Sequence, residues 1–251
     1  MSKVYAVANQ KGGVAKTTTV HALGAALASL GDRVLLVDLD PQACLTYSTG
    51  TDPDALERSV HDCFVRDVPA QDVVLKVGDL VLLPASIDLA GSELFLLGKT
   101  GREFALKKVL APIRDDYDVV LLDCPPSLGV LTIGALTAAD AVIIPMQCEA
   151  LSERGVQQLV ETINDVREFT NPNLQTKGII ATMFDGRTLE GRRVLDNVAA
   201  KTGLVVLEPP VRRSVRFAEA PTAGRSIVEH APRHAGADAY RRLAQTLRED
   251  R

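Results

Sequence analysis

The chain has 251 residues, of which 46% are hydrophobic and 24% charged, and this composition excludes disordered and fibrous proteins. Its length suits one open α/β unit, so we expect residues 1–251 to form a single domain. The four cysteines show no CxxC spacing, which favours free thiols in a reducing cytoplasm. No stretch has the length of a signal peptide core or a membrane span, so we expect a soluble, internal protein.

Charge is distributed unevenly along the chain. The net charge is -4, but residues 1–175 carry 14 basic and 23 acidic side chains, whereas residues 176–251 carry 14 basic and nine acidic ones. A net positive C-terminal third beside a net negative remainder permits a local anionic partner.

Apolar runs rich in β-branched residues alternate with segments of helical spacing. The runs expected to be strands are 4–8, 34–37, 80–83, 119–122, 141–144, 178–183 and 204–207. Helical spacing occurs in 18–30, 151–169, 192–201 and 237–251. This order predicts an α/β fold with a doubly wound, mostly parallel sheet flanked by helices.

The first expected strand runs into a glycine-rich loop, and a helical pattern follows at once. Glycines let the backbone turn sharply and aim its amides at phosphate oxygens at the start of a helix. Lys16 can reach the β and γ phosphates, and the Thr17 hydroxyl can ligate magnesium. The alternative is a glycine-rich strand-to-helix turn with an incidental lysine, but the motif together with its context favours a phosphate loop. We therefore predict that ATP and Mg²⁺ bind at Lys11, Gly12, Gly13, Val14, Ala15, Lys16, Thr17 and Thr18.

Carboxylates follow the second and fourth of these expected strands. Asp38 and Asp40 lie after 34–37, and Asp123 follows 119–122, at the strand ends where open α/β sheets bind ligands. Alone, each would be read as a helix cap or turn residue. With the glycine-rich loop upstream, we expect Asp40 to orient the attacking water. Thr17, Asp40 and Asp123 are expected to hold magnesium, the carboxylates through water, with Asp38 supporting the same ion.

The loop departs from the pattern GxxxxGK[ST] because Gln10 and Ala15 occupy its glycine positions, and it reads KGGxxKT instead. This variant, with VDLDPQ at 37–42, resembles the deviant Walker A ATPases of the ParA/MinD family, and the resemblance extends along most of the chain. It implies that two ATP-loaded subunits meet face to face and that Lys11 acts in the partner's site. The alternative for Lys11 is an exposed lysine without a role. The family usually has glycine in place of Ala15, so we expect the added methyl group to affect hydrolysis.

Two later segments, 183–188 and 209–221, resemble ParA sequences that line the adenine pocket and contribute to a nonspecific DNA surface. The resemblance assigns Met183, Arg212 and Ser214 to the pocket, although the family usually has proline and asparagine at 212 and 214. It assigns Arg187, Arg213 and Arg216 to DNA phosphates. Neighbouring cations that would add to this surface are Lys177, Arg192, Arg193 and Arg225. The alternative for the arginines is a solvated, salt-bridged helix face.

The last helical segment, 237–251, carries Ala239, Tyr240, Leu243 and Leu247 at helical spacing. Its apolar face is narrow, so we expect it to pack on the sheet rather than to insert into a membrane. The four histidines form no metal motif, and no transition-metal site is expected.

Together these features predict a ParA-like ATPase for chromosome or plasmid partition or for cargo positioning. ATP would form a homodimer that binds DNA nonspecifically, in the cytoplasm and on the nucleoid, and a ParB-like or other protein would stimulate slow hydrolysis. Two alternatives stay open: a MinD-like, membrane-associated regulator of cell division, and a metabolic P-loop phosphotransferase.

Overall fold

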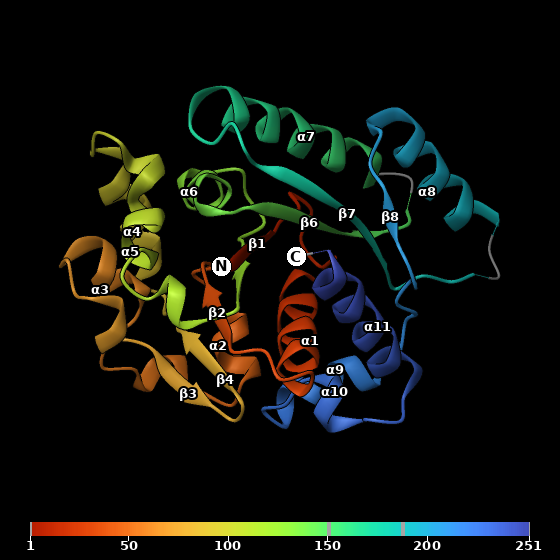
Figure 1. Ribbon diagram of the computed structural model, residues 1–251, viewed down its shortest axis with the longest axis horizontal. Coiled ribbons are helices and arrows are strands. Elements are labelled where there is room, and N and C mark those ends of the chain that lie inside the picture. Colours follow the sequence, from red (N-terminus) through yellow and green to blue (C-terminus); the bar gives the residue numbers. More distant parts are fainter. Residues whose placement is uncertain (1, 150–151, 187–188, 251) are drawn as a thin grey trace.

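The computed structural model describes residues 2–149, 152–186 and 189–250. In these residues one sheet has eight strands, in the order β3-β4-β2-β5-β1-β6-β7-β8 (Figure 1). The strands are β1 (Lys3–Val7), β2 (Val34–Asp38), β3 (Leu75–Val77), β4 (Leu80–Leu83), β5 (Val119–Asp123), β6 (Ala141–Gln147), β7 (Gln175–Thr182) and β8 (Val206–Leu207). All neighbouring strands are parallel except β3 and β4. The predicted doubly wound, mostly parallel sheet is confirmed.

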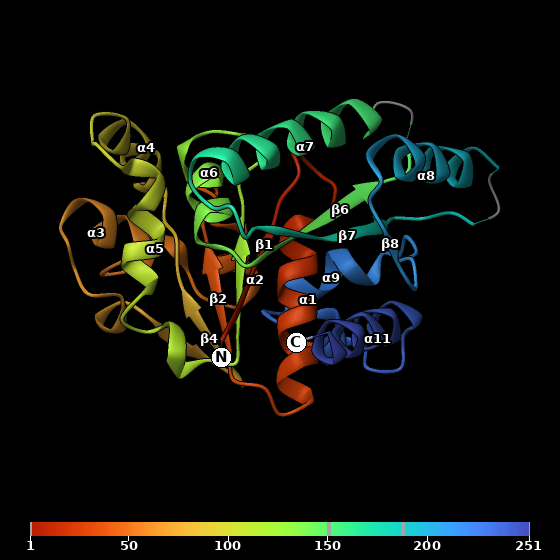
Figure 2. The same ribbon diagram turned by 45° about the horizontal axis from the view of Figure 1, so that its top comes forward.

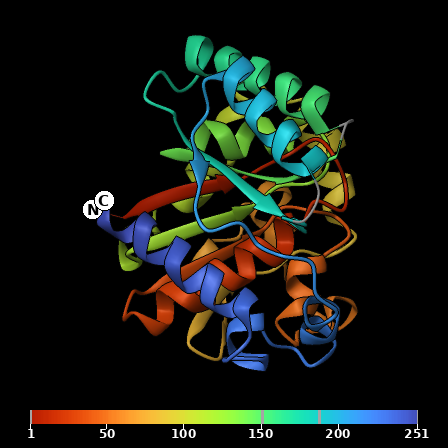
Figure 3. The ribbon, with the colours of Figure 1, turned by 90° about the vertical axis from the view of Figure 1, so that its right-hand side faces the viewer.

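Helices cover both faces of the sheet. They are α1 (Lys16–Ser29), α2 (Cys44–Ser48), α3 (Val60–Val65), α4 (Leu89–Leu97), α5 (Ala105–Leu110), α6 (Val130–Ala138), α7 (Ser152–Phe169), α8 (Leu189–Thr202), α9 (Arg216–Thr222), α10 (Ile227–His230) and α11 (Ala235–Glu249). Figure 2 shows α3, α4 and α5 grouped on the side where β2 and β4 lie. Figure 3 shows α7 and α8 above the strands and α1 and α11 below them.

Alternate residues of the strands therefore enter two separate cores. In β1, Val4 and Ala6 pack into the core beneath α3 to α8, whereas Tyr5 and Val7 pack into the core shared with α1 and α11. Strands that are buried on both faces consist of nearly continuous apolar residues, which is why these runs stand out in the sequence.

The edge strand β3 is not predicted from the sequence. It has only three residues, and its side chains are half-buried or exposed, so it lacks the apolar run that marks the other strands. Gly78 and Asp79 connect it to β4 as a two-residue hairpin, with Gly78 at a φ of 61°. A glycine followed by aspartate is a recognised hairpin signal, and it was the only available sign of this strand.

The C-terminal helix α11 packs against α1. Tyr240, Leu243 and Leu247 are buried, and the Tyr240 hydroxyl lies 2.9 Å from Oγ1 of Thr19 in α1. We expected this helix to pack on the sheet. It packs mainly against α1 and reaches the sheet where the Tyr5 hydroxyl of β1 donates to the Leu247 carbonyl oxygen at 3.4 Å. Among the described residues, the helices are all too short or too polar to cross a membrane.

Three strands bring their carboxyl ends together at one edge. Asp38 at the end of β2 is in register with Asp123 at the end of β5, and Asp123 is in register with Val7 at the end of β1. The loops that follow these three strands consequently start side by side. This is where ligands bind in open α/β sheets.

Candidate functional site

The glycine-rich loop between β1 and α1 has the backbone that phosphate binding requires. Gly13 and Ala15 adopt left-handed conformations, with φ of 73° and 68°, and Ala15 directly precedes the first residue of α1, Lys16. The amides of the first helical turn have no intrahelical acceptor and point along the helix dipole. These amides make the start of α1 a site for anions.

Lys16 is buried at the start of α1. Its Nζ donates to the carbonyl oxygen of Lys11 at 3.3 Å, which folds the lysine back over the loop. Burial lowers the pKa of Lys16, and the negative charges around it, Asp123 foremost, oppose that change. A cation held inside the loop is placed to neutralise phosphate charge.

Asp123 is the most unusual group at this edge. Its side chain is buried, and neither of its carboxylate oxygens has a hydrogen-bond partner. Burial raises the pKa of Asp123 well above its ordinary value, and the charge of Asp38 adds to that effect. The Thr17 hydroxyl is close enough to oppose this rise but does not complete a hydrogen bond to the carboxylate.

A buried carboxylate without a partner costs free energy unless it binds a cation. Carboxylate and hydroxyl oxygens are the ligands that magnesium prefers. Asp123 and Thr17 therefore fit the expected magnesium ion.

Asp38 has a different environment from the one expected. Its Oδ1 accepts from the amide of Asp40 at 3.1 Å, and its Oδ2 accepts from both the amide and the hydroxyl of Thr46, each at 2.8 Å. Burial raises its pKa to about 6. These three hydrogen bonds make Asp38 an anchor for the loop that follows β2. Its support of magnesium through water stays a prediction.

Asp40 lies in the loop that Asp38 anchors. The amide of Gln42 donates to Oδ1 of Asp40 at 2.9 Å, and the amide of Ala43 donates to its carbonyl oxygen at 2.8 Å. This local turn engages one carboxylate oxygen and leaves the other for water. Asp40 lines the same cavity as Lys16 and Thr17, as its predicted role in orienting water requires.

The cavity at this edge has a volume of about 740 Å³. This falls in the range of pockets that enclose ligands of nucleotide size. The predicted binding residues that line it are Gly12, Gly13, Ala15, Lys16, Thr17, Thr18, Met183, Arg212 and Ser214. The structure thus brings the two ParA-like C-terminal segments to the phosphate loop, across a long separation in sequence.

Two of the predicted loop residues do not line the cavity. The carbonyl oxygen of Val14 accepts from the Thr182 hydroxyl at 2.9 Å, which ties the loop to the end of β7. Lys11 points to Glu149 after β6, with 2.7 Å between Nζ and Oε2. The Val14 carbonyl oxygen therefore holds the loop against β7, and the Lys11 amine forms an ion pair within its own chain.

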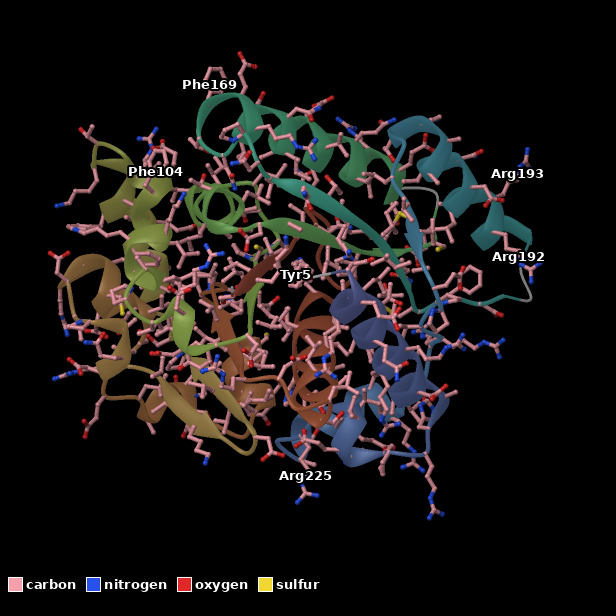
Figure 4. All side chains as sticks on the ribbon, in the orientation of Figure 1. Tyr5, Phe104, Phe169, Arg192, Arg193 and Arg225 are labelled. Atoms are coloured by element: carbon pink, nitrogen blue, oxygen red, sulfur yellow. The ribbon has the colours of Figure 1, made fainter. Side chains whose placement is uncertain are left out.

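The predicted DNA-contacting arginines occupy different surroundings. Arg213 is exposed beside the cavity, while Arg216 pairs with Glu219 at 2.7 Å. Arg187 lies outside the described residues. Figure 4 shows Arg192 and Arg193 projecting outward from α8 and Arg225 projecting from the segment before α10. Arg225 therefore lies apart from Arg192 and Arg193, which are neighbours on α8.

Lys177, the remaining cation proposed for this surface, is engaged elsewhere. It pairs with Asp250 at 2.6 Å.

Three residues at this site are not predicted from the sequence. Thr46 binds Asp38, Glu149 binds Lys11, and the Asn9 side chain joins the Pro145 carbonyl oxygen to the Lys11 amide at 2.8 and 3.0 Å. Two of these contacts join residues more than 130 positions apart, so no local pattern could have indicated them.

Comparisons with known proteins agree with this geometry. The family model described as AAA domain matches residues 2–176. The sporulation initiation inhibitor protein Soj of Bacillus subtilis is 43% identical over 98% of this chain and 98% of its own. The chromosome partitioning protein ParA of Caulobacter vibrioides is 41% identical over 98% of this chain and 93% of its own.

Solved structures give the same picture. A Mycobacterium smegmatis protein named cobyrinic acid a,c-diamide synthase, with bound ADP and magnesium, is 50% identical with a TM-score of 0.90, over 99% of this chain and 95% of its own. The septum site-determining protein MinD of Pyrococcus horikoshii has a TM-score of 0.82 at 21% identity, over 98% and 96% of the two chains, and shows the shared fold.

Proposed function

We propose, since this chain belongs to the ParA/Soj family of P-loop ATPases, that it hydrolyses magnesium-ATP to position DNA or another cargo in the cell. The observation that carries the proposal is the partnerless carboxylate of Asp123 beside Lys16 in the phosphate loop. The names of the Soj and ParA relatives support the positioning role. Location in the cytoplasm, on the nucleoid, follows from the same proposal.

The residues divide the chemistry among themselves. The loop amides and Lys16 hold the β and γ phosphates, and Asp40 orients a water for attack on the γ phosphorus. Thr17 and Asp123 would hold magnesium, with Asp40 contacting its shell through water. When bound there, the ion would supply positive charge that neutralises the phosphates.

Dimerisation would complete the site. We propose that Lys11 reaches the γ phosphate of a second subunit, where a cation stabilises negative charge that develops in the transition state. Hydrolysis would then depend on assembly, and a ParB-like or other protein could accelerate it. Slow hydrolysis without that partner would prolong the dimeric state.

Dimerisation would also double the exposed cations available to DNA. Arg213 has no ion pair in the described part of the chain. To bind a DNA phosphate, Arg216 would have to break only its exposed ion pair with Glu219. Pairing with phosphates requires no base reading, so the binding would be nonspecific and salt-dependent. ATP would thereby control DNA binding.

Asp40→Ala tests the ATPase part of the proposal. The variant is expected to bind magnesium-ATP, to hydrolyse it at least roughly 100-fold more slowly, and to accumulate as a dimer in sedimentation experiments. A variant that remains monomeric with ATP while wild type dimerises would contradict the role of Asp40.

Charge reversal tests the DNA part. Arg213→Glu with Arg216→Glu is expected to abolish gel shifts of arbitrary duplex DNA and to leave ATP-dependent dimerisation intact. Lys107→Glu with Lys108→Glu, at exposed positions of α5, changes the net charge equally and should retain DNA binding. Equal retention by both double variants would place the DNA surface elsewhere.

A second candidate function follows from the M. smegmatis structure, whose name is that of a diamide synthase. In that case ATP would activate a carboxylate of a cobyrinic acid-like substrate before amide formation. The cavity residues include no acid or base cluster beyond those already assigned to phosphate and magnesium. This candidate would be favoured if the rate of ATP turnover increased when cobyrinic acid and a nitrogen donor for the new amide were added, but not when DNA was added.

A further inference from the structure

The loop that carries Asp40 is closed at both ends by one buried side chain. Asp38 accepts from the amide of Asp40 through Oδ1 and from Thr46 through Oδ2. The two ends of the segment 40–46 are thereby fixed to the end of β2. Since Asp38 is fully buried, these bonds are shielded from water and carry more weight than surface contacts.

The hydroxyl of Thr46 connects this carboxylate to a second strand. It donates to Oδ2 of Asp38 at 2.8 Å and accepts from the amide of Ala85, beyond the end of β4, at 3.0 Å. Thr46 is itself fully buried. Removing its oxygen would leave both the Ala85 amide and the Asp38 carboxylate one hydrogen bond short, without a water to replace it.

The short helix α2, which contains Thr46, is also tied to α1. The Ser48 hydroxyl donates to the Leu45 carbonyl oxygen at 2.8 Å, so His21 of α1 is the donor in the 3.1 Å contact between its Nδ1 and the Ser48 oxygen. The beginning of α1 holds Lys16 and Thr17. Contacts of α2 with β2, with the segment after β4 and with α1 therefore fix the Asp40 loop relative to the phosphate loop.

Among the residues that the structure describes, only the Thr46 hydroxyl joins the Asp40 loop both to the end of β2 and to the segment after β4. We propose that Thr46 is a positioning residue for hydrolysis: through Asp38 and the Ala85 amide it holds Asp40 where it can orient the attacking water. Thr46 contacts neither the nucleotide nor magnesium in this account. The inference rests on the proposed ATPase function and adds a residue to it.

Two substitutions separate the hydroxyl from the shape of Thr46. Thr46→Val keeps the volume and removes the oxygen, and Thr46→Ser keeps the oxygen and removes a methyl group. We expect Thr46→Val to lower kcat for ATP hydrolysis by roughly 10- to 100-fold, the size of effect that supporting contacts have at ligand sites. Its affinity for magnesium-ATP is expected to stay within about 2-fold, because the phosphate loop is unchanged. Thr46→Ser is expected to retain most of the wild-type kcat.

Thr49→Val serves as the matched control. The Thr49 hydroxyl donates to the carbonyl oxygen of Thr46 at 2.7 Å in the same segment but takes no part in the bonds to Asp38 and Ala85. The Thr49→Val variant should therefore keep the wild-type kcat for ATP hydrolysis. If the valine variant of Thr46 does not fold, Thr46→Ala removes the same oxygen without placing a methyl group against the carboxylate, and the same comparison applies.

The outcomes separate this inference from the function on which it rests. A wild-type protein that does not hydrolyse ATP would overturn the proposed function. Wild-type hydrolysis with an unchanged kcat in Thr46→Val would overturn only the role of Thr46. Equal losses in the valine and serine variants would also overturn it, because shape rather than the hydroxyl would then be responsible.

Discussion

Nζ of Lys11 lies 2.7 Å from Oε2 of Glu149 in the same chain. The Lys11 amine, through its hydrogen bond and its charge, lowers the pKa of Glu149. The lysine that resembles the trans-acting lysine of the ParA/MinD family is thus paired internally in the single chain. The proposed entry of Lys11 into a partner's site would require this ion pair to break.

Glu149→Gln is therefore expected to favour dimerisation. Removing the carboxylate charge weakens the internal pair and frees Lys11, so half-maximal dimer formation with magnesium-ATP should occur at a lower protein concentration. Sedimentation velocity measures this midpoint. Glu153→Gln is the control, because Glu153 pairs with Lys201 and not with Lys11. An unchanged or higher midpoint in the Glu149 variant would contradict competition between the two pairings.

Ala15→Gly is expected to stabilise the protein. Ala15 has a φ of 68°, a conformation that costs a residue with a Cβ about 1–2 kcal/mol, and part of this is offset by the greater freedom of glycine in the unfolded chain. We expect the free energy of unfolding in urea to rise by roughly 1 kcal/mol. Ala200→Gly, at an exposed position inside α8, should instead lower it by about 1 kcal/mol. Destabilisation by both substitutions would show that Ala15 is not strained.

Asp123→Asn is expected to separate magnesium binding from nucleotide binding. The buried carboxylate is the group that fits the cation, so the variant should lose roughly 10- to 100-fold in magnesium affinity while retaining ATP binding in EDTA. Removing a buried carboxylate that has no hydrogen-bond partner should leave the metal-free protein at least as stable as wild type. Titrations of ATP with and without magnesium measure the difference, and Asp115→Asn, at an exposed position, is the control. Unchanged magnesium dependence in the Asp123 variant would remove this residue from the site.

His21 is expected to make the fold sensitive to acid. Burial lowers the pKa of His21 to about 4, from an ordinary value of 6.5. In the unfolded chain His21 keeps its ordinary pKa and binds the proton more tightly than in the folded protein. The free energy of unfolding is therefore at its full value above pH 6.5 and falls as the pH is lowered towards 4. Between pH 7 and pH 5 the free energy of unfolding should fall by about 2 kcal/mol.

Urea unfolding at the two pH values, with His21→Asn as the reference, isolates this contribution from the titration of the carboxylates. Asparagine keeps a donor for Ser48 but does not titrate. The same pH dependence in wild type and variant would show that His21 is not the group responsible.

The sequence identified the parts of the site that depend on local pattern. The phosphate loop, the carboxylates at the strand ends and the buried strands all follow from residue types at short spacing. The proposed division of roles between Asp38 and Asp40 does not, because it depends on which carboxylate accepts a hydrogen bond from the Thr46 hydroxyl in the folded chain. The partner of Lys11 is 138 residues away, and only the packing of β6 beside β1 brings it close.

The central claim is that the strand–helix junction at Lys16 captures ATP with magnesium. Isothermal titration calorimetry of the purified chain with magnesium-ATP tests it most directly. The account predicts one saturable binding event per chain, which Lys16→Ala abolishes. No heat and no saturable uptake by the wild-type chain, or equal binding by the Lys16 variant, would contradict it.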